Sequence, residues 1–413
     1  MQPPNVLVFS LVLGSIFVAL DAYVLLRFRR FIRRHGLSKH WLTAALIVAT
    51  ASLLVYVFVA WRRHLFRMDG LDLDLFMMVC LWYLPKLPIA IALLITQVVR
   101  SSKYTYTWIT RKPKPPIPNQ PDLPSRRKLL ERSAWSIAAV PYVMVANGMV
   151  NTLYDFTVHK ETIVLPGLPR AMDGFTLVQI SDIHAGSFPD EKPFAEVVRI
   201  IHALKPDAIV VTGDFVNTSP SEMTTVSTGL QRLATLSPTF ASLGNHDHYN
   251  SASDHRQLIR GIRSLGVDLL INEHRRIGKG EEGFVLAAID NIGFKQNFGN
   301  LGLALQNVHP DEPTVLLAHD PTYWDKAIVA KAPVNLMLSG HTHGGQIAFS
   351  MLGFELSPAS FVYEQVAGLY SKGEQMLYVN RGLGTVGPPL RIGVPPEVTV
   401  FTLRSPKLTD NMA

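Results

Sequence analysis

Three long apolar runs dominate the first hundred residues, at 6–26, 41–61 and 75–99. Each has about the 20 residues that an α-helix needs to cross the hydrocarbon core of a bilayer. None shows the polar face that a buried helix of a soluble domain would carry on its outer side. The pattern therefore predicts about three transmembrane helices within residues 1–100.

Two charged residues lie inside these runs. Asp21 is near the end of the first run and can reach the interface, whereas Lys86 lies within the third, between Pro85 and Pro88. Such a lysine must snorkel or face a partner helix, and intramembrane charges raise transport as a possible role. Three or four short spans without internal symmetry make a poor transporter, so we expect these charges to pair with each other or with lipid head groups.

The charges of the connecting segments predict the orientation of the spans. Residues 27–40 carry six basic residues and no acidic one, and residues 100–132 carry nine basic residues against Asp122 and Glu131. Basic loops stay on the cytoplasmic side, while the mixed charges of residues 62–74 suit the opposite side. The N-terminus is therefore expected outside the cytoplasm.

Residues 101–132 are expected to form a basic linker rich in proline, with paired arginines at Arg126 and Arg127. A fourth, weakly apolar segment comes next, at 133–150. Paired arginines before such a segment resemble a twin-arginine export signal, although an ordinary fourth span or an interfacial helix is an equal alternative. A signal or a span would place the rest of the chain outside the cytoplasm, and an interfacial helix would keep it inside.

The remaining residues alternate between strand-like and helical patterns. Helical spacing of apolar residues covers 193–204, and a further helix is expected at 222–236. The strand-like runs are apolar without alternation, which is typical of sheets buried on both faces, so we expect an α/β fold with helices outside. The expected strands are 175–180, 208–212, 239–243, 315–318, 334–338, 376–379 and 398–403.

Five of these strands end in residues of metal-ligand type. Sheet proteins place ligands at the carboxyl ends of their strands, so this order is unlikely to arise by chance, although each element alone would be weak. The residues concerned are Asp182 and His184, Asp214, Asn245 to Asp247, His319, and His341 with His343.

The ordered set Asp182-x-His184, Gly213-Asp214, Gly244-Asn245-His246-Asp247, His319 and Gly340-His341-Thr342-His343 resembles the motifs of calcineurin-like metallophosphoesterases. The residues from Gly344 to Gln346 and from Asn380 to Gly384 resemble the bacterial membrane-associated or twin-arginine-exported branch. The resemblance implies a four-layer αββα sandwich over residues 155–405 that acts as a metal-dependent phosphohydrolase.

The resemblance also implies the role of each residue. One metal would be bound by Asp182, His184 and His343, the other by Asn245, His319 and His341, with Asp214 bridging the two. Imidazoles mixed with hard oxygens suit Mn²⁺, Fe or Zn²⁺ and argue against Ca²⁺, and Mn²⁺ is the choice for assays in vitro. Two such cations can activate a shared hydroxide for in-line attack at phosphorus.

His246 matches the family position of a general acid or charge stabiliser near the leaving oxygen, and Asn245 should present its amide N–H to a phosphate oxygen. The family's second motif commonly ends in an aspartate that orients this histidine, but here Asn217 stands in its place. We expect the Asn217 amide to accept a hydrogen bond from the imidazole without supplying negative charge, and so a lower pKa for His246 than in such relatives.

Charge and cysteine content argue against nucleic-acid binding and against cysteine-based sites. The net charge of +7 arises from the first 150 residues, which hold 19 basic and 6 acidic residues. Because the basic residues lie beside apolar runs, nucleic acid is not expected as a partner. Cys80 is the only cysteine, which excludes a disulfide framework and a cysteine-based metal site within the chain.

We therefore expect a multi-pass protein of the bacterial inner membrane with an extracytoplasmic catalytic domain. Its substrate would be a phosphomonoester or phosphodiester, on a lipid or lipid-linked molecule if the membrane attachment reflects the substrate. An alternative is a cytoplasm-facing hydrolase of nucleotide-linked lipid precursors, like UDP-diacylglucosamine pyrophosphatases. A degenerate binding domain is disfavoured because the ligand set is intact. Loops at 278–283 and 347–372 would decide how open the cleft is.

Overall fold

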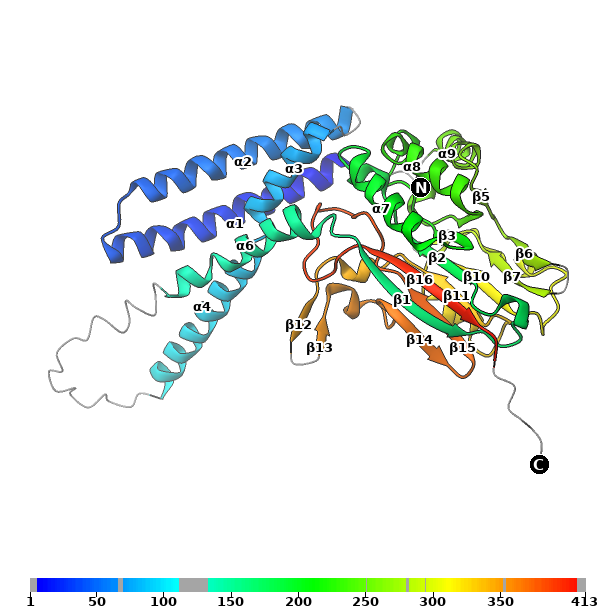
Figure 1. The fold of residues 1–413 in the computed structure, drawn as a ribbon. Helices are drawn as coiled ribbons and strands as arrows, with labels where there is room; N and C mark the ends of the chain where they lie inside the picture. Colours follow the sequence, from blue (N-terminus) through cyan, green and yellow to red (C-terminus); the bar gives the residue numbers. More distant parts are fainter. Residues whose placement is uncertain are drawn as a thin grey trace. The chain divides into compact units, whose positions relative to one another are not determined.

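The computed structural model describes residues 6–65, 70–110, 133–249, 251–279, 282–293, 295–351 and 354–406. The chain divides into two compact units, Met1–Asn147 and Gly148–Ala413. The first unit is helical, and the second contains the sheets (Figure 1).

Among the described residues, four helical segments are long and apolar enough to cross a membrane: Ser10–His35, His40–Ala60, Asp72–Ile109, which comprises two helices, and Ser133–Thr152. The last of these continues into the second unit, and it includes the segment for which a span was one alternative. The helices described in this unit are α1 (Val6–His35), α2 (His40–Leu65), α3 (Gly70–Tyr83), α4 (Lys86–Ile109) and α6 (Val140–Asn147).

The third apolar run is divided where a single span was expected. Helix α3 ends at Tyr83 and α4 begins at Lys86, with Pro85 between them. Proline lacks the N–H that continues a helix and disfavours the helical conformation before it, which explains the break. Helix α4 then runs to Ile109, so the first residues of the expected linker are helical. The proline-rich part and the paired arginines lie outside the described residues.

The two intramembrane charges pair with each other. The Lys86 ammonium contacts the Asp21 carboxylate, and the Tyr83 hydroxyl donates a hydrogen bond of 3.0 Å to the same carboxylate. Lys86 is 2% exposed and Asp21 8% exposed. The pair therefore links α1 to α3 and α4 inside the helical unit.

The second unit is built around two six-stranded sheets. The order in the first is β1-β16-β2-β3-β4-β5, and the order in the second is β14-β15-β11-β10-β7-β6. The strands of the first sheet are β1 (Thr157–Val164), β2 (Thr176–Ile180), β3 (Ala208–Thr212), β4 (Thr239–Ser242), β5 (Asp268–Leu269) and β16 (Glu397–Arg404). Those of the second are β6 (Glu273–Lys279), β7 (Glu282–Ala288), β10 (Thr314–Leu317), β11 (Leu336–Ser339), β14 (Gly368–Lys372) and β15 (Gln375–Val379).

The strands that are apolar at successive positions are buried on both faces, as their sequence indicates. All residues of β3, β10 and β11 are buried. One cluster, which includes Val210 and Leu286, fills the space between the sheets. On the outer face of the first sheet pack α7 (Lys192–Leu204), α8 (Ser227–Leu236) and α9 (Ala252–Ser264) (Figure 1).

The outer face of the second sheet is covered by short helical segments, α10 (Leu301–Ala304) and the turn at Trp324–Ile328. The unit therefore has the expected four layers.

The sheet register corrects the expectation for the loop at 278–283. Strand β7 runs parallel to β10, whose carboxyl end leads to His319. Gly278 and Gly283 pair at the start of β7, so they lie at the opposite end of the sheet from the predicted ligands. These residues cannot shape the cleft, whereas the segment at 347–372 returns to the site at Tyr363.

Candidate metal centre

Six of the seven predicted ligands gather at one edge of the two sheets. Strands β2, β3 and β4 are parallel neighbours, as are β10 and β11, so their carboxyl ends meet. The buried strands thus position the polar residues that follow each of them. The residues brought together are Asp182, His184, Asp214, His319, His341 and His343. Asn245 follows β4 directly before His246, whose backbone N–H donates a hydrogen bond to Asp214.

The backbone bends sharply at most of these positions. Asp182, His184, Asp214, His341 and His343 all adopt positive φ, between 42° and 73°. Residues with side chains rarely occupy this left-handed region, and such strain gathers at functional sites. These five residues follow β2, β3 and β11, so the turns direct side chains from three strands into one volume instead of along the strands.

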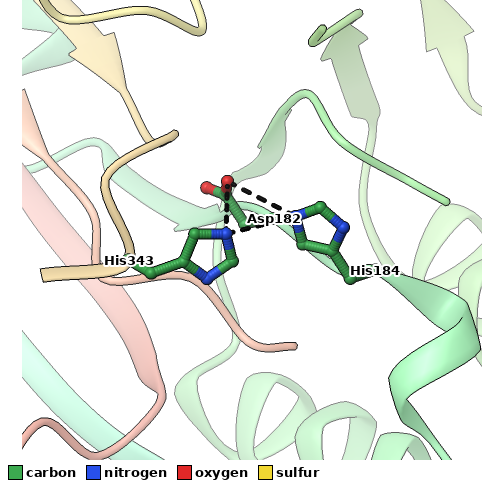
Figure 2. Close-up of side chains that lie close together, drawn as sticks. All are labelled: Asp182, His184 and His343. Carbon is green, nitrogen blue, oxygen red and sulfur yellow. Dashed lines mark hydrogen bonds and ion pairs between the residues drawn. The ribbon is translucent and has the colours of Figure 1, made fainter. Parts of the chain in front are cut away.

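Asp182, His184 and His343 form the first group (Figure 2). The Nε2 atoms of His184 and His343 lie 3.1 Å apart, and Asp182 Oδ1 lies 3.2 Å from His343 Nε2 and 3.9 Å from His184 Nε2. The Asp182 and His184 residues are fully buried. Three ligand atoms therefore converge on one point away from solvent.

Asp214, His319 and His341 form the second group. Asp214 Oδ2 lies 3.1 Å from His319 Nε2, and His341 Nδ1 lies 3.2 Å from the same nitrogen. Asp214 Oδ2 is also 3.5 Å from His184 Nε2 in the first group. Asp214 thus contacts both groups, as a bridging ligand must.

The donor atoms of these groups fit a cation. His319 Nδ1 lies 2.7 Å from the Thr212 carbonyl oxygen and must carry a proton to donate to it. In the neutral ring His319 Nε2 then presents a lone pair to the Asp214 carboxylate, and two such acceptors repel unless a proton or cation lies between them. Asn245 Oδ1 is also buried without a hydrogen-bond partner among the described residues. Imidazole, carboxylate and amide donors together suit a divalent transition metal.

The charges of the cluster move the pKa values of its members in opposite directions. Burial acts to lower the pKa of His319, but the charge and hydrogen bond of Asp214, together with the charge of Asp182 and the hydrogen bond to Thr212, raise it to about 10. Burial, and then the charge of the nearby His319, lower the pKa of His341 to about 4. Burial would raise the pKa of Asp182, but the charge of His343 holds it below its ordinary value. Without a cation, the carboxylates thus hold a proton on a histidine.

Asp247 fixes the turns that carry Asp214 and Asn245. Its carboxylate accepts hydrogen bonds from the backbone N–H groups of Asp214 at 3.0 Å, Phe215 at 2.9 Å and Gly244 at 2.9 Å. Burial, and then the charge of Asp214, raise its pKa to about 7. The sequence motif contains Asp247, but the spacing of the motif does not reveal that the Asp247 carboxylate accepts backbone hydrogen bonds instead of binding a metal.

His246 lies beside the first group, with its ring edge-on to His184 at 4.7 Å between centroids. Its Nδ1 lies 2.8 Å from the backbone carbonyl oxygen of Asn217. The expectation that the Asn217 amide holds this ring is therefore wrong: Asn217 does orient the histidine, but through its backbone. The identity of the side chain at 217 does not enter this contact.

Two tyrosines that were not assigned to the site from the sequence contact its residues. Tyr249 accepts a hydrogen bond of 2.7 Å from Asn245 Nδ2, so in this structure the amide N–H faces a phenol and not open space. The Tyr363 hydroxyl lies 3.0 Å from His341 Nε2. Tyr249 could have been suspected because it comes shortly after the Asn245 motif, whereas Tyr363 carries no signal in the sequence.

Family models match both units. A model described as calcineurin-like phosphoesterase matches residues 175–345, and one described as the transmembrane domain of a probable calcineurin-like phosphoesterase matches residues 5–152.

Individual relatives agree with these matches. A "transmembrane protein with metallophosphoesterase domain" from Bos taurus is 31% identical, with 68% of this chain and 65% of its own length covered. The metallophosphoesterase YkuE of Bacillus subtilis is 34% identical over 60% of this chain and 85% of its own length. The phosphodiesterase YaeI of Escherichia coli is 30% identical over 55% of this chain and 82% of its own. The chain thus spans slightly less than two thirds of the bovine relative.

Proposed function

The chain belongs to the calcineurin-like phosphoesterases, metal-dependent phosphohydrolases, and from that premise we propose that it hydrolyses a phosphate ester at a membrane with two divalent cations. The observation that carries the proposal is the convergence of buried acceptor atoms around Asp214, which contacts both ligand groups. The catalytic unit is assigned to residues 155–405.

We assign one cation to Asp182, His184 and His343 and the other to Asn245, His319 and His341. Asp214 would be shared by both. The unpartnered Oδ1 of Asn245 supports its assignment, because a buried amide oxygen is costly unless something binds it. Mn²⁺, Fe or Zn²⁺ would suit this donor set, and when bound they would supply Lewis acidity and lower the pKa of a water molecule.

The chain's own residues would orient the ester and deliver a proton. Hydrolysis forms a bond from the water oxygen to phosphorus and breaks the bond from phosphorus to the alcohol oxygen, which needs a proton. His246, held at Nδ1 by the Asn217 carbonyl, leaves Nε2 free, and in the imidazolium form of the ring Nε2 would supply this proton and become neutral. Asn245 Nδ2, now donating to Tyr249, could turn to a phosphate oxygen of the substrate.

The chain is a membrane protein, and we propose that it is a multi-pass protein of a bacterial inner membrane with its catalytic unit outside the cytoplasm. Four candidate spans after an external N-terminus return the chain to the external side. The basic segments at 27–40 and 100–132 support this orientation. A lipid or lipid-linked phosphate is the substrate that such a location favours.

The direct test is hydrolysis by the purified full chain. We would load it with Mn²⁺ and assay bis(p-nitrophenyl) phosphate and p-nitrophenyl phosphate with the parent, His246→Ala and Asp214→Asn. His246→Ala should lower kcat by about 10² to 10⁴-fold with metal still bound, as expected for loss of a general acid. Asp214→Asn should lose both metal and activity.

His202→Ala, at an exposed position on α7, is the matched control and should match the parent. A His246→Ala variant as active as the parent, or hydrolysis that survives removal of metal, would overturn the proposal.

A further inference from the structure

The segment from Gln346 to Tyr363 begins and ends at the metal centre. It leaves the turn that carries His343, and it returns where the Tyr363 hydroxyl meets His341 Nε2 at 3.0 Å. Within it the chain forms a short hairpin and the helical turn Pro358–Phe361. The Ser357 hydroxyl donates to the Gly344 carbonyl at 3.1 Å, which ties this turn back to the ligand loop. The described parts of this segment, 346–351 and 354–363, therefore form a wall of the site.

This wall presents large apolar side chains to the surroundings. Phe361 is 81% exposed and its neighbour Val362 is 74% exposed, and Phe349 on the same segment is 45% exposed. We call these three residues the apolar rim. A single exposed apolar side chain is ordinary, but adjacent ones beside a reaction site mark a surface that something apolar contacts.

The chain itself indicates what that apolar partner is. Its described residues include four candidate membrane spans, and residues 153–156 separate the last of them from β1. A linker of four residues reaches about 14 Å at most, so the catalytic unit is tethered close to a bilayer. The hydrocarbon chains of lipids are thus the apolar material that is always within reach.

We propose that the substrate is a phosphate ester of a long-chain lipid, and that the apolar rim contacts its hydrocarbon chain while the phosphate lies at the metal centre. This inference rests on the proposed hydrolytic function, and it adds the residues that bind the hydrocarbon chain of the lipid. The rim ends directly before Tyr363 and begins beyond the His343 turn, so chain and phosphate would be bound by the same segment. Phe361 and Val362 are then specificity-determining residues, because a soluble ester offers them nothing to bind.

The test compares two esters on the same full-length enzyme. One is a dioleoyl lipid phosphate in phosphatidylcholine vesicles, as monoester or diester according to which chromogenic ester the enzyme cleaves. The other is that soluble chromogenic ester. For the variant Phe361→Ser/Val362→Ser we expect the ratio of kcat/KM on lipid to kcat/KM on soluble ester to fall about 10- to 100-fold. This is the factor in kcat/KM expected when the burial of one such apolar side chain against the lipid is lost.

Two further variants make the result specific. Val164→Ser/Leu236→Ser changes apolar residues that are 53% and 40% exposed. Val164 pairs with Arg404 at the far end of the first sheet, and Leu236 ends α8 before β4 begins, so both lie away from the site. This control should leave the ratio unchanged. Phe361→Trp/Val362→Ile, which keeps the rim apolar, should retain the parent ratio.

The inference is overturned if the serine variant keeps the parent ratio, or if it loses activity on both esters equally. It is also overturned if the dioleoyl substrate is cleaved no better than its dihexanoyl counterpart. Failure of the proposed function looks different, because the parent enzyme would then cleave no soluble ester at all.

Discussion

At the scale of single residues, the protein holds two key histidines by one ring nitrogen each and leaves the other nitrogen for chemistry. Thr212 and Asn217 do this for His319 and His246 through backbone carbonyls. The sequence identified the ligands because their types and order are diagnostic. It could not identify these partners, because every residue has a carbonyl and its direction depends on the local fold.

Residue charges also set part of the pH dependence of stability. The pKa of Glu312 is lowered to about 2 by hydrogen bonds from the Arg276 guanidinium, at 2.9 and 3.0 Å, and by one from the His309 N–H. The folded chain thus binds this proton more weakly than the unfolded chain, whose pKa is near 4.5. Glu312 therefore contributes stability above pH 4.5 that is lost as the pH falls toward 2.

We expect Arg276→Gln to make the acid-induced fall in Tm of the chelator-treated chain shallower over this window. At pH 7 the loss of stability should be on the order of 1 kcal/mol or less, because the pair is partly exposed. Calorimetry from about pH 3 to 7 measures it, with Arg232→Gln on α8 as control. A variant with the parent slope would show that the Arg276 contact does not stabilise the carboxylate.

At the scale of elements, the strands that end in ligands were predicted within two residues at each end, because long apolar runs admit few alternatives. Strands β1 and β6 were missed because they alternate or carry charge, as in the Glu273–Lys279 sequence. Helix α9, with its polar composition, was missed for the same reason. These elements cover the edges of the fold, where burial leaves a weaker pattern.

The turn after β11 is crowded enough to make Gly340 necessary. A Cβ there would lie 1.9 Å from Ser181 Oγ and 2.1 Å from Asp182 Oδ2. Gly340→Ala should therefore displace Asp182, reduce the bound metal, and lower kcat by about 10²-fold, the cost of a misplacement near 1 Å. Metal analysis and kinetics together measure both effects.

Gly261→Ala is the matched control, because a Cβ there meets nothing within 4 Å on α9. It should keep full activity and gain roughly 0.5–1 kcal/mol of stability, since glycine is unfavourable within a helix. Two metals and parent activity in Gly340→Ala would contradict this account of the turn.

In the helical unit, the contact of Asp21 with Lys86 links α1 to α4. Asp21→Leu leaves Lys86 buried without its counter-charge, and breaking such a pair costs about 3–5 kcal/mol. We expect a lower Tm in detergent for Asp21→Leu and recovery in Asp21→Leu/Lys86→Met, which removes both charges. Ser15→Ala on α1 serves as control. A single variant as stable as the parent would mean that the pair contributes nothing.

At the scale of the whole molecule, the sequence separated a basic apolar part from an acidic α/β part, and the structure divides the chain after Asn147. Span number was less certain, because Pro85 interrupts one run and the segment after residue 133 is only weakly apolar. The apolar runs reveal the length and composition of each span but not the side of the membrane on which its ends lie. The predicted orientation therefore rests on the charges of the connecting segments.

The orientation can be tested with single cysteines in a Cys80→Ala background. Ser253 on α9 and Ser38 between α1 and α2 are both exposed. We expect a membrane-impermeant maleimide to label Ser253→Cys once the outer envelope is opened, and Ser38→Cys only after the inner membrane is disrupted. The reverse pattern would place the catalytic unit in the cytoplasm and favour a nucleotide-linked lipid precursor.

The central claim is that these strand ends hold two catalytic cations. The most direct measurement counts the metal bound by the full, chelator-stripped chain during titration with Mn²⁺, while hydrolysis of a chromogenic phosphate ester is followed in the same samples. The account predicts about two ions per chain, activity that rises with their binding, and loss of both in Asp214→Asn. Binding of no more than one ion at full activity, or hydrolysis without metal, would contradict it.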